Sequence, residues 1–245
     1  MKTRKLYEEY HKNSRLQKRI LSNSNFTYYY LIDTLNRNLK KVRNVLDIGC
    51  GTGAIDFYLA HKSIFVTGVD ISKKAIQIAK KNSKKLNLDR KTKFVVSEFP
   101  YTKINKKYDL IICSEILEHI RDDSKAVEVV YKLLKSGGLA IFSSPSINAP
   151  AYKTGIAQKH DLLAGHLRRY NTSEYSKLIS NTGFRIIKIE RNQSFFRDIL
   201  FMSNIGKFFI KAANRFGLIS KILLLFDRLI LPFGESDIMV VARKK

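Results

Sequence analysis

Short apolar runs alternate with stretches of helical periodicity along most of the chain. Each run has the length of a buried parallel strand. Between the runs, apolar residues recur every three or four positions, which predicts helices over 54–61, 72–86 and 122–134. This alternation implies an α/β fold, a parallel sheet with helices on both faces. The predicted strands are 45–48, 64–71, 92–98, 108–113 and 139–145, followed by 184–191 and 237–242.

Capping residues indicate where several of these helices begin and end. Ser72 is expected to cap the helix after the second strand, and Thr172 a helix over 173–182. The glycine pair 137–138 is expected to end the helix that precedes the fifth strand.

Glycines stand at alternate positions, 49, 51 and 53, between the first strand and the first helix. They remove Cβ atoms and permit positive φ where backbone must approach a nucleotide-like ligand. The spacing G-x-G-x-G differs from the G-x-G-x-x-G of dinucleotide-binding proteins. The carboxylate of Asp47 beside the turn would also repel a pyrophosphate. Both features argue against an NAD enzyme.

Asp70 follows the second strand, 21 residues after Gly49. An acid at this strand tip can accept both hydrogen bonds from a ribose diol. Because Ser72 is the better helix cap, we expect Asp70 to be left free for that role.

The stretch 146–171 reads as irregular and collects histidine, arginine and tyrosine. On a loop at the carboxyl side of a sheet such residues indicate a substrate site, although an ordinary surface loop is the alternative. The residues concerned are His160, His166, Arg168, Arg169 and Tyr170.

Two segments lie outside the alternating core, which we place at 44–194 and 235–245. Residues 1–43 predict two helices, which either form a lid over the ligand or pack on the sheet edge. Residues 195–234 interleave bulky apolar residues with single cations, and form an amphipathic helical insertion. Such a segment suits a membrane interface, with a substrate lid or a dimer face as alternatives, and the oligomeric state stays open.

The composition narrows the setting. The chain has 245 residues and a formal net charge of +24, which favours anionic partners such as nucleic acid, an anionic membrane surface or a phosphorylated substrate. A Lys- and Asn-rich genome would give the same charge. Two cysteines without metal-type spacing, no signal-like start and no long apolar run predict a cytoplasmic protein with no metal and no transmembrane span.

Four ordered motifs resemble the class I S-adenosylmethionine-dependent methyltransferases, and most closely the ubiquinone-biosynthesis-like small-molecule branch. The resemblance covers roughly residues 44–145 and the final two strands. It implies a Rossmann-like, seven-stranded, mostly parallel sheet whose last strand is antiparallel, and S-adenosyl-L-methionine as cofactor. The motifs are VLDIGCGTG at 45–53, VTGVDIS at 66–72, YDLIICSEILEHI at 108–120 and LLKSGGLAIF at 133–142.

The resemblance also assigns cofactor contacts. Asp47 and the turn residues would border the methionine moiety, whose ammonium and the neighbouring sulfonium suit a carboxylate. Asp70 would bind the ribose. The remaining contacts would be Gly49, Cys50, Gly51 and Gly53 in the turn, Ile71 and Glu98 or Phe99 at the adenine, and Ser114 at the methionine end.

Transfer of the methyl group to a hydroxyl needs a base within hydrogen-bond reach. The candidates are His119, His160 and His166, with Glu118 as an alternative. Arg168 and Arg169, with Tyr170, could hold an acidic or phosphate-bearing substrate. His11 and His61 are expected to be surface residues.

The resulting hypothesis is a cytoplasmic O-methyltransferase for a small or lipid-linked molecule, with a peripheral position on the inner face of a membrane as the alternative setting. A nucleic-acid methyltransferase is the first alternative, but the usual Asn/Asp-Pro-Pro-aromatic motif is replaced by Ser-Glu-Ile-Leu at 114–117 and no RNA-binding module is recognisable. A non-catalytic cofactor-binding subunit is the second alternative.

Overall fold

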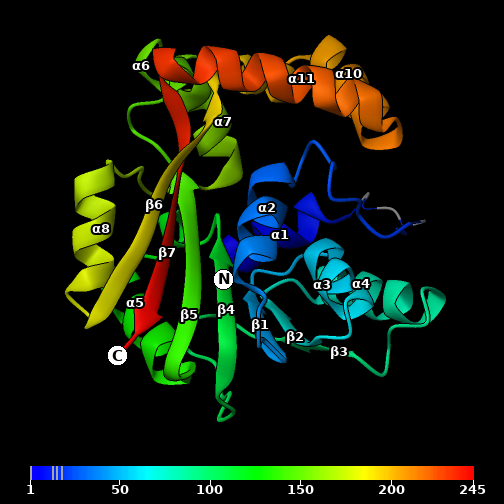
Figure 1. Cartoon of the computed structure of the whole chain (residues 1–245), viewed down its shortest axis with the longest axis vertical. Helices are drawn as coiled ribbons and strands as arrows, with labels where there is room; N and C mark the ends of the chain where they lie inside the picture. Colours follow the sequence, from blue (N-terminus) through cyan, green and yellow to red (C-terminus); the bar gives the residue numbers. More distant parts are fainter. Residues whose placement is uncertain (1, 13, 15, 18) are drawn as a thin grey trace.

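The computed structural model describes residues 2–12, 14, 16–17 and 19–245. They form a seven-stranded sheet of order β3-β2-β1-β4-β5-β7-β6 (Figure 1). Among these strands, β7 is antiparallel to both of its neighbours, while the other pairs are parallel. The predicted Rossmann-like fold class is confirmed. The strands are β1 (Asn44–Ile48), β2 (Phe65–Asp70), β3 (Thr92–Val96), β4 (Tyr108–Ser114), β5 (Leu134–Pro145), β6 (Phe184–Ser194) and β7 (Glu235–Lys244).

The central strands are apolar on both sides, because helices cover both faces of the sheet. Successive side chains of a strand point to opposite faces, so Leu110 packs with α2 (Tyr29–Asn38) and α3 (Ala54–His61), whereas Ile111 packs with α5 (Asp123–Leu133) and α8 (Thr172–Ser180). Helix α4 (Lys73–Lys85) packs beside α3 against β3 through Ile76 and Phe94.

The helix ends correct two expectations. Helix α5 ends at Leu133, and the glycine pair 137–138 lies inside β5 at a register shift opposite β4. A Cβ on Gly138 would lie 2.9 Å from the Lys135 carbonyl oxygen, so this glycine serves a close backbone approach and not a helix cap.

Helix α8 is capped by Asn171 and not by Thr172. The Asn171 side chain accepts a hydrogen bond from the Glu174 N–H, and the Glu174 carboxylate accepts one from the Asn171 N–H. This capping box satisfies two otherwise unpaired N–H groups. The cap at Ser72 is confirmed, since its hydroxyl accepts a bond from the Ala75 N–H.

The stretch 146–171 is not irregular throughout. It contains α6 (Pro150–Lys153) and α7 (Ile156–Ala164), which ends at Gly165 with φ of 80°. Helix α7 therefore carries His160, while His166 lies just beyond its end.

The insertion folds into α9 (Phe195–Met202), α10 (Asn204–Arg215), α11 (Gly217–Ile230) and the 3-10 turn η2 (Leu231–Phe233). It leaves the sheet at the end of β6 and returns at the start of β7, where Asp237 pairs with the last residue of β5. The three helices consequently lie over the edge at which the parallel strands end (Figure 1).

A buried ion pair fastens this insertion to the N-terminal region. Asp227 of α11 accepts hydrogen bonds from Arg197 Nε at 3.0 Å, Tyr30 Oη at 2.8 Å, and both the N–H and the hydroxyl of Ser194. Arg197 Nη1 also donates to the Phe26 carbonyl at 2.7 Å. Because Arg197 is 1% and Asp227 0% exposed, each charge depends on the other for compensation.

Candidate functional site

The turn after β1 is held against the end of β2. Both Gly49 N–H and Cys50 N–H donate to the Val69 carbonyl, at 2.8 and 3.0 Å. Gly49 has φ of 75°, and a Cβ there would lie 2.0 Å from Cδ1 of Ile116. The turn therefore needs glycine at 49 both for its conformation and for its contact with the segment after β4.

Asp70 ends β2 directly beside this turn. Its two carboxylate oxygens accept hydrogen bonds from the Gly51 N–H at 2.9 Å and the Ser72 N–H at 2.8 Å. Asp70 was expected to be free of the helix cap because the Ser72 side chain provides it. This was wrong, because the Ser72 backbone N–H also donates a hydrogen bond to Asp70. Burial raises the pKa of Asp70 in spite of these two bonds.

A second acid, Asp56, lies against Asp47 beneath the turn. Asp47 is 6% and Asp56 0% exposed. Burial raises the pKa of Asp47 to about 7, and raises that of Asp56 well above its usual range. Sequence reasoning missed Asp56, although it is the one charged residue within the otherwise apolar segment 54–60.

The other predicted cofactor contacts lie at the carboxyl ends of the strands. Cys50 points its sulfur inward toward Gly68, so only its backbone can face a ligand. Ser114 ends β4 with its hydroxyl 2.8 Å from that of Ser143. At the neighbouring strand ends, Ile71 and Phe99 are half-buried and Glu98 is exposed.

Helix α1 (Lys2–Tyr10) lies across this region. His11, expected at the surface, is half-buried, with Cε1 3.6 Å from where a Gly51 Cβ would be. Burial lowers the pKa of His11. The Glu8 carboxylate accepts bonds from the Lys73 N–H at 2.7 Å and the Lys74 N–H at 3.1 Å, at the start of α4. The acid thus fastens α1 at a helix N-terminus, where negative charge is favourable.

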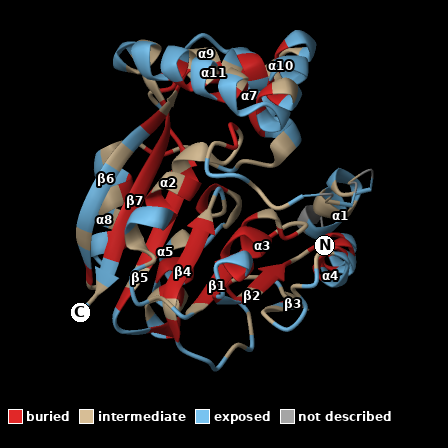
Figure 2. Cartoon of the chain, turned by 45° about the vertical axis from the view of Figure 1, so that its right-hand side comes forward, coloured by how far each residue is buried: buried red, intermediate tan, exposed pale blue. Residues whose placement is uncertain are grey.

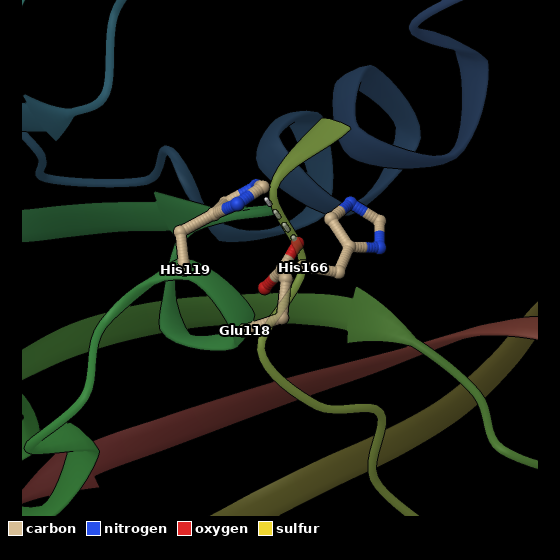
Figure 3. A group of neighbouring side chains, drawn as sticks. All are labelled: Glu118, His119 and His166. Atoms are coloured by element: carbon tan, nitrogen blue, oxygen red, sulfur yellow. Dashed lines mark ion pairs between the residues drawn. The ribbon is translucent and has the colours of Figure 1, made fainter. Parts of the chain in front are cut away.

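The three candidate histidines come together from two distant segments. His119 ends the 3-10 turn η1 (Leu117–His119) after β4, and its ring centroid is 4.8 Å from that of His166. His160 is 6.5 Å from His166 by the same measure. Glu118 is fully buried, with Oε1 3.8 Å from His119 Nε2 (Figure 3). Tyr7 of α1 packs edge-on against His119.

The Nδ1 atom of each of these two rings lies close to an oxygen atom. His119 Nδ1 is 3.2 Å from the Gly165 carbonyl, and His166 Nδ1 is 3.0 Å from the Asp161 carboxylate. Burial lowers the pKa of His119 to about 4, so its imidazole is neutral at pH 7 and can accept a proton. Burial and the nearby Glu115 raise the pKa of Glu118.

The same groups have the donor types of a cation site. Three possible ligand atoms lie within 4.8 Å of one another, one each from Glu118, His119 and His166. Two imidazoles and a carboxylate can ligate a divalent cation, with Asp161 and the Gly165 carbonyl orienting the rings. The sequence expectation of no metal rested on cysteine spacing, which carries no signal about ligands drawn from η1 and the segment after α7.

The three predicted substrate ligands are engaged within the chain. Arg169 bonds Asp161 through Nε at 2.7 Å and Nη2 at 2.8 Å. Arg168 pairs with Asp123, which also accepts a 2.7 Å bond from the Tyr170 hydroxyl. These bonds hold the segment that carries His166, because Asp161 contacts both Arg169 and His166.

The insertion presents a wide apolar surface. Figure 2 shows how much of α9 to α11 is exposed. A 240 Å³ pocket lies between α9 and the segment 151–156, and a 470 Å³ pocket lined by Tyr29, Lys221 and Arg228 lies beside α11. Within the described residues, no helix is long and apolar enough to cross a membrane. The exposed apolar residues of the insertion include Ile199, Ile205, Phe208, Phe209, Phe216, Leu218, Ile222, Leu225, Phe226, Leu229 and Phe233.

Residues 39–192 match the methyltransferase domain family. A ubiquinone biosynthesis O-methyltransferase of Nitrosomonas europaea is 31% identical over 137 residues, which are 56% of this chain and 57% of that protein. One of Coxiella burnetii is 36% identical over 156 residues, 61% of this chain and 66% of that protein. The chain thus matches less than two thirds of the length of these relatives.

Solved structures share the fold. Phosphoethanolamine N-methyltransferase 2 of Haemonchus contortus, in complex with S-adenosyl-L-methionine, has a TM-score of 0.61 and 19% identity over 85% of this chain and 52% of that one. Magnesium protoporphyrin IX methyltransferase of Synechocystis, with bound SAH, has a TM-score of 0.63 and 16% identity over 99% and 98% of the two chains.

Proposed function

The chain belongs to the methyltransferase domain family, and from that premise we propose that it is an S-adenosylmethionine-dependent enzyme that methylates an oxygen of a small, lipid-linked acceptor at a membrane surface. The observation that carries the proposal is the contact between the glycine turn and the histidine cluster. Ile116 packs on Gly49, and Glu118 and His119 follow it by two and three residues. A methyl donor on the turn therefore lies beside candidate bases.

In this proposal the bound cofactor supplies a methyl group activated on a sulfonium. Asp47 would accept a hydrogen bond from the α-ammonium of the cofactor, and Asp70 would accept hydrogen bonds from its ribose hydroxyls. The glycines at 49, 51 and 53 would let backbone approach the methionine end. Ile71 would contact the adenine, with Glu98 or Phe99 at its edge. Helix α1 covers the site: Tyr7 contacts His119 at one end of the site, and His11, just after the helix, contacts Gly51 at the other.

His119 is the proposed base. Its imidazole is neutral, and Nε2, which lies 3.8 Å from Glu118 Oε1, would take the proton from an acceptor hydroxyl. The oxygen would form its bond to the methyl carbon as the bond from that carbon to sulfur breaks, which would leave S-adenosylhomocysteine. His166 and His160 line the same side and help position the acceptor. Arg169 acts through Asp161, which orients His166, and Arg168 with Tyr170 holds the loop to α5.

The insertion is the proposed membrane contact. Residues 195–234 contain six cations and two acids, and both acids are engaged inside the protein, Asp227 with Arg197 and Asp198 with the Ser236 hydroxyl. The outer surface therefore combines cations with large apolar side chains, which suits the headgroup region of an anionic bilayer. The relatives named for ubiquinone biosynthesis make a prenylated phenol the first acceptor to test.

The decisive assay measures formation of S-adenosylhomocysteine with wild-type protein and with His119→Gln, offering a prenylated dihydroxybenzene in anionic vesicles or an RNA transcript. Turnover on the phenol that falls in the variant supports the proposal. Turnover on RNA alone favours a nucleic-acid methyltransferase. Cofactor binding with no turnover on either acceptor favours a non-catalytic subunit.

A further inference from the structure

Asp56 is a buried acid without a visible function in the fold. It stands three residues after Gly53, at the capping-box position of α3, yet the Gly53 N–H bonds the Cys50 carbonyl instead. Both carboxyl oxygens are enclosed, and neither meets a conventional donor among the residues that the structure describes. Such a group costs free energy unless it finds a partner.

The surrounding backbone leaves room for this side chain. A Cβ at Gly68 of β2 would lie 2.6 Å from Asp56 Oδ1, 2.8 Å from Cys50 Sγ and 2.8 Å from Phe94 Cδ1. Glycine at 68 thus lets an acid lie where a larger residue would exclude it. The space is occupied by an acid and a thiol under the cofactor turn, not by apolar packing alone.

Asp56 meets the side chain of Asp47, the carboxylate that we propose for the methionine end of the cofactor. Asp70 faces the pair from β2, Cys50 from the turn and Tyr28 from the segment before α2, while His11 and Glu8 of the N-terminal segment act on Asp70. Two enclosed carboxyls in contact cannot both ionise. Burial raises the pKa of Asp56 well above its usual range and that of Asp47 to about 7, which favours Asp56 as the carboxyl that keeps the proton.

We propose that Asp56 is a positioning residue for cofactor binding: as a neutral acid it donates its proton to one oxygen of Asp47 and leaves the other oxygen aimed at the cofactor ammonium. The inference rests on the proposed placement of the cofactor. The proposal gives α3 a role separate from that of the glycine motif. The glycines shape the backbone of the turn, whereas Asp56 orients the side chain of Asp47.

The arrangement has a definite pH dependence. The ammonium binds the ionised form of Asp47, whose pKa is about 7 in the free protein. Affinity should therefore reach its plateau about one pH unit above 7 and fall about tenfold per pH unit well below 7. The bond from Asp56 lowers the pKa of Asp47, so loss of that donor should move the midpoint upward.

The test is the affinity for S-adenosylhomocysteine, which keeps the ammonium, measured by calorimetry from pH 6 to pH 8 in the full chain. Asp56→Asn keeps a donor and should bind within about threefold of wild type with the same midpoint. Asp56→Leu should bind about tenfold more weakly at pH 7, with its midpoint shifted upward. Circular dichroism establishes that each variant is folded.

Two results would overturn the inference. One is a loss of tenfold or more in Asp56→Asn, which would make Asp56 an anion that contacts the ligand. The other is a wild-type pH profile in Asp56→Leu. Should that variant not fold, infrared spectroscopy decides: the difference spectrum between wild type and Asp56→Asn must show the band of one protonated carboxylic acid that the variant has lost. Unchanged binding in Asp47→Asn would instead refute the cofactor placement itself.

Discussion

The buried pair between Arg197 and Asp227 makes the strongest prediction about stability. Replacing Asp227 with asparagine leaves the Arg197 guanidinium at 1% exposure without its counter-charge. Breaking a buried ion pair in this way costs about 3–5 kcal/mol. The Tyr30 hydroxyl and the Ser194 N–H and hydroxyl also lose a charged acceptor. The substitution should therefore weaken the packing of α9 and α11 against the N-terminal region.

The measurement combines thermal unfolding with hydrogen exchange. For a chain of this length, 3–5 kcal/mol corresponds to a fall in Tm of about 6–20 °C if the whole fold unfolds together. If the insertion detaches first, exchange should accelerate in α9 to α11 while β1 and β4 stay protected. Asp33→Asn is the matched control, since Asp33 pairs with Arg37 at the surface and such a pair contributes about 0–1 kcal/mol.

A double variant separates charge from packing. Arg197→Met combined with Asp227→Leu removes both charges and should recover part of the loss, because an apolar pair of similar size avoids the desolvation cost. Asp227→Asn with a Tm within about 2 °C of wild type and unchanged exchange in the insertion would refute the reasoning.

Three further results are expected. His119→Gln should lower kcat by about 10²–10⁴-fold with unchanged cofactor affinity, and the exposed His61→Gln should change neither; equal loss in both would exclude the base assignment. Burial lowers the pKa of His119 from 6.5 to about 4. The stability that the neutral imidazole contributes is therefore complete above pH 6.5 and is lost as pH falls toward 4, about 3 kcal/mol in all. The free energy of unfolding in urea from pH 7 to pH 4 should accordingly depend less on pH in His119→Gln than in wild type. Wild-type protein should co-sediment with anionic vesicles, and the double variant Phe208→Ser with Leu218→Ser should bind them more weakly. The control Phe65→Ser also removes an exposed apolar side chain, on β2, and should not weaken binding. Unchanged sedimentation of the double variant would leave a lid or dimer role for α9 to α11.

Local patterns in the sequence were enough for the fold and the family. The alternation of apolar runs with helical segments predicts a parallel sheet, because the spacing of apolar residues within each element shows which of its faces is buried. The glycine turn with Asp47 and the acid at Asp70 are likewise readable, since their spacing is set along the chain.

Other features depend on partners that lie far apart in sequence. The sequence suggests Arg169 as a substrate ligand because its charge is visible, while only the fold shows that Asp161 of α7 bonds it. His11 was assigned to the surface, and only the path of α1 brings it to Gly51. The pair 137–138 resembles a helix end until its register against β4 is seen.

The protonation states were the least accessible part of the site. A sequence lists Asp47 and Asp56 as two ordinary acids nine positions apart. Only the tertiary structure encloses both under one turn, and it is this shared enclosure, not their residue type, that prevents both from ionising. The sequence by itself therefore determined which ligand the turn suits, and the tertiary structure decided which two carboxyl groups share one enclosure beneath it.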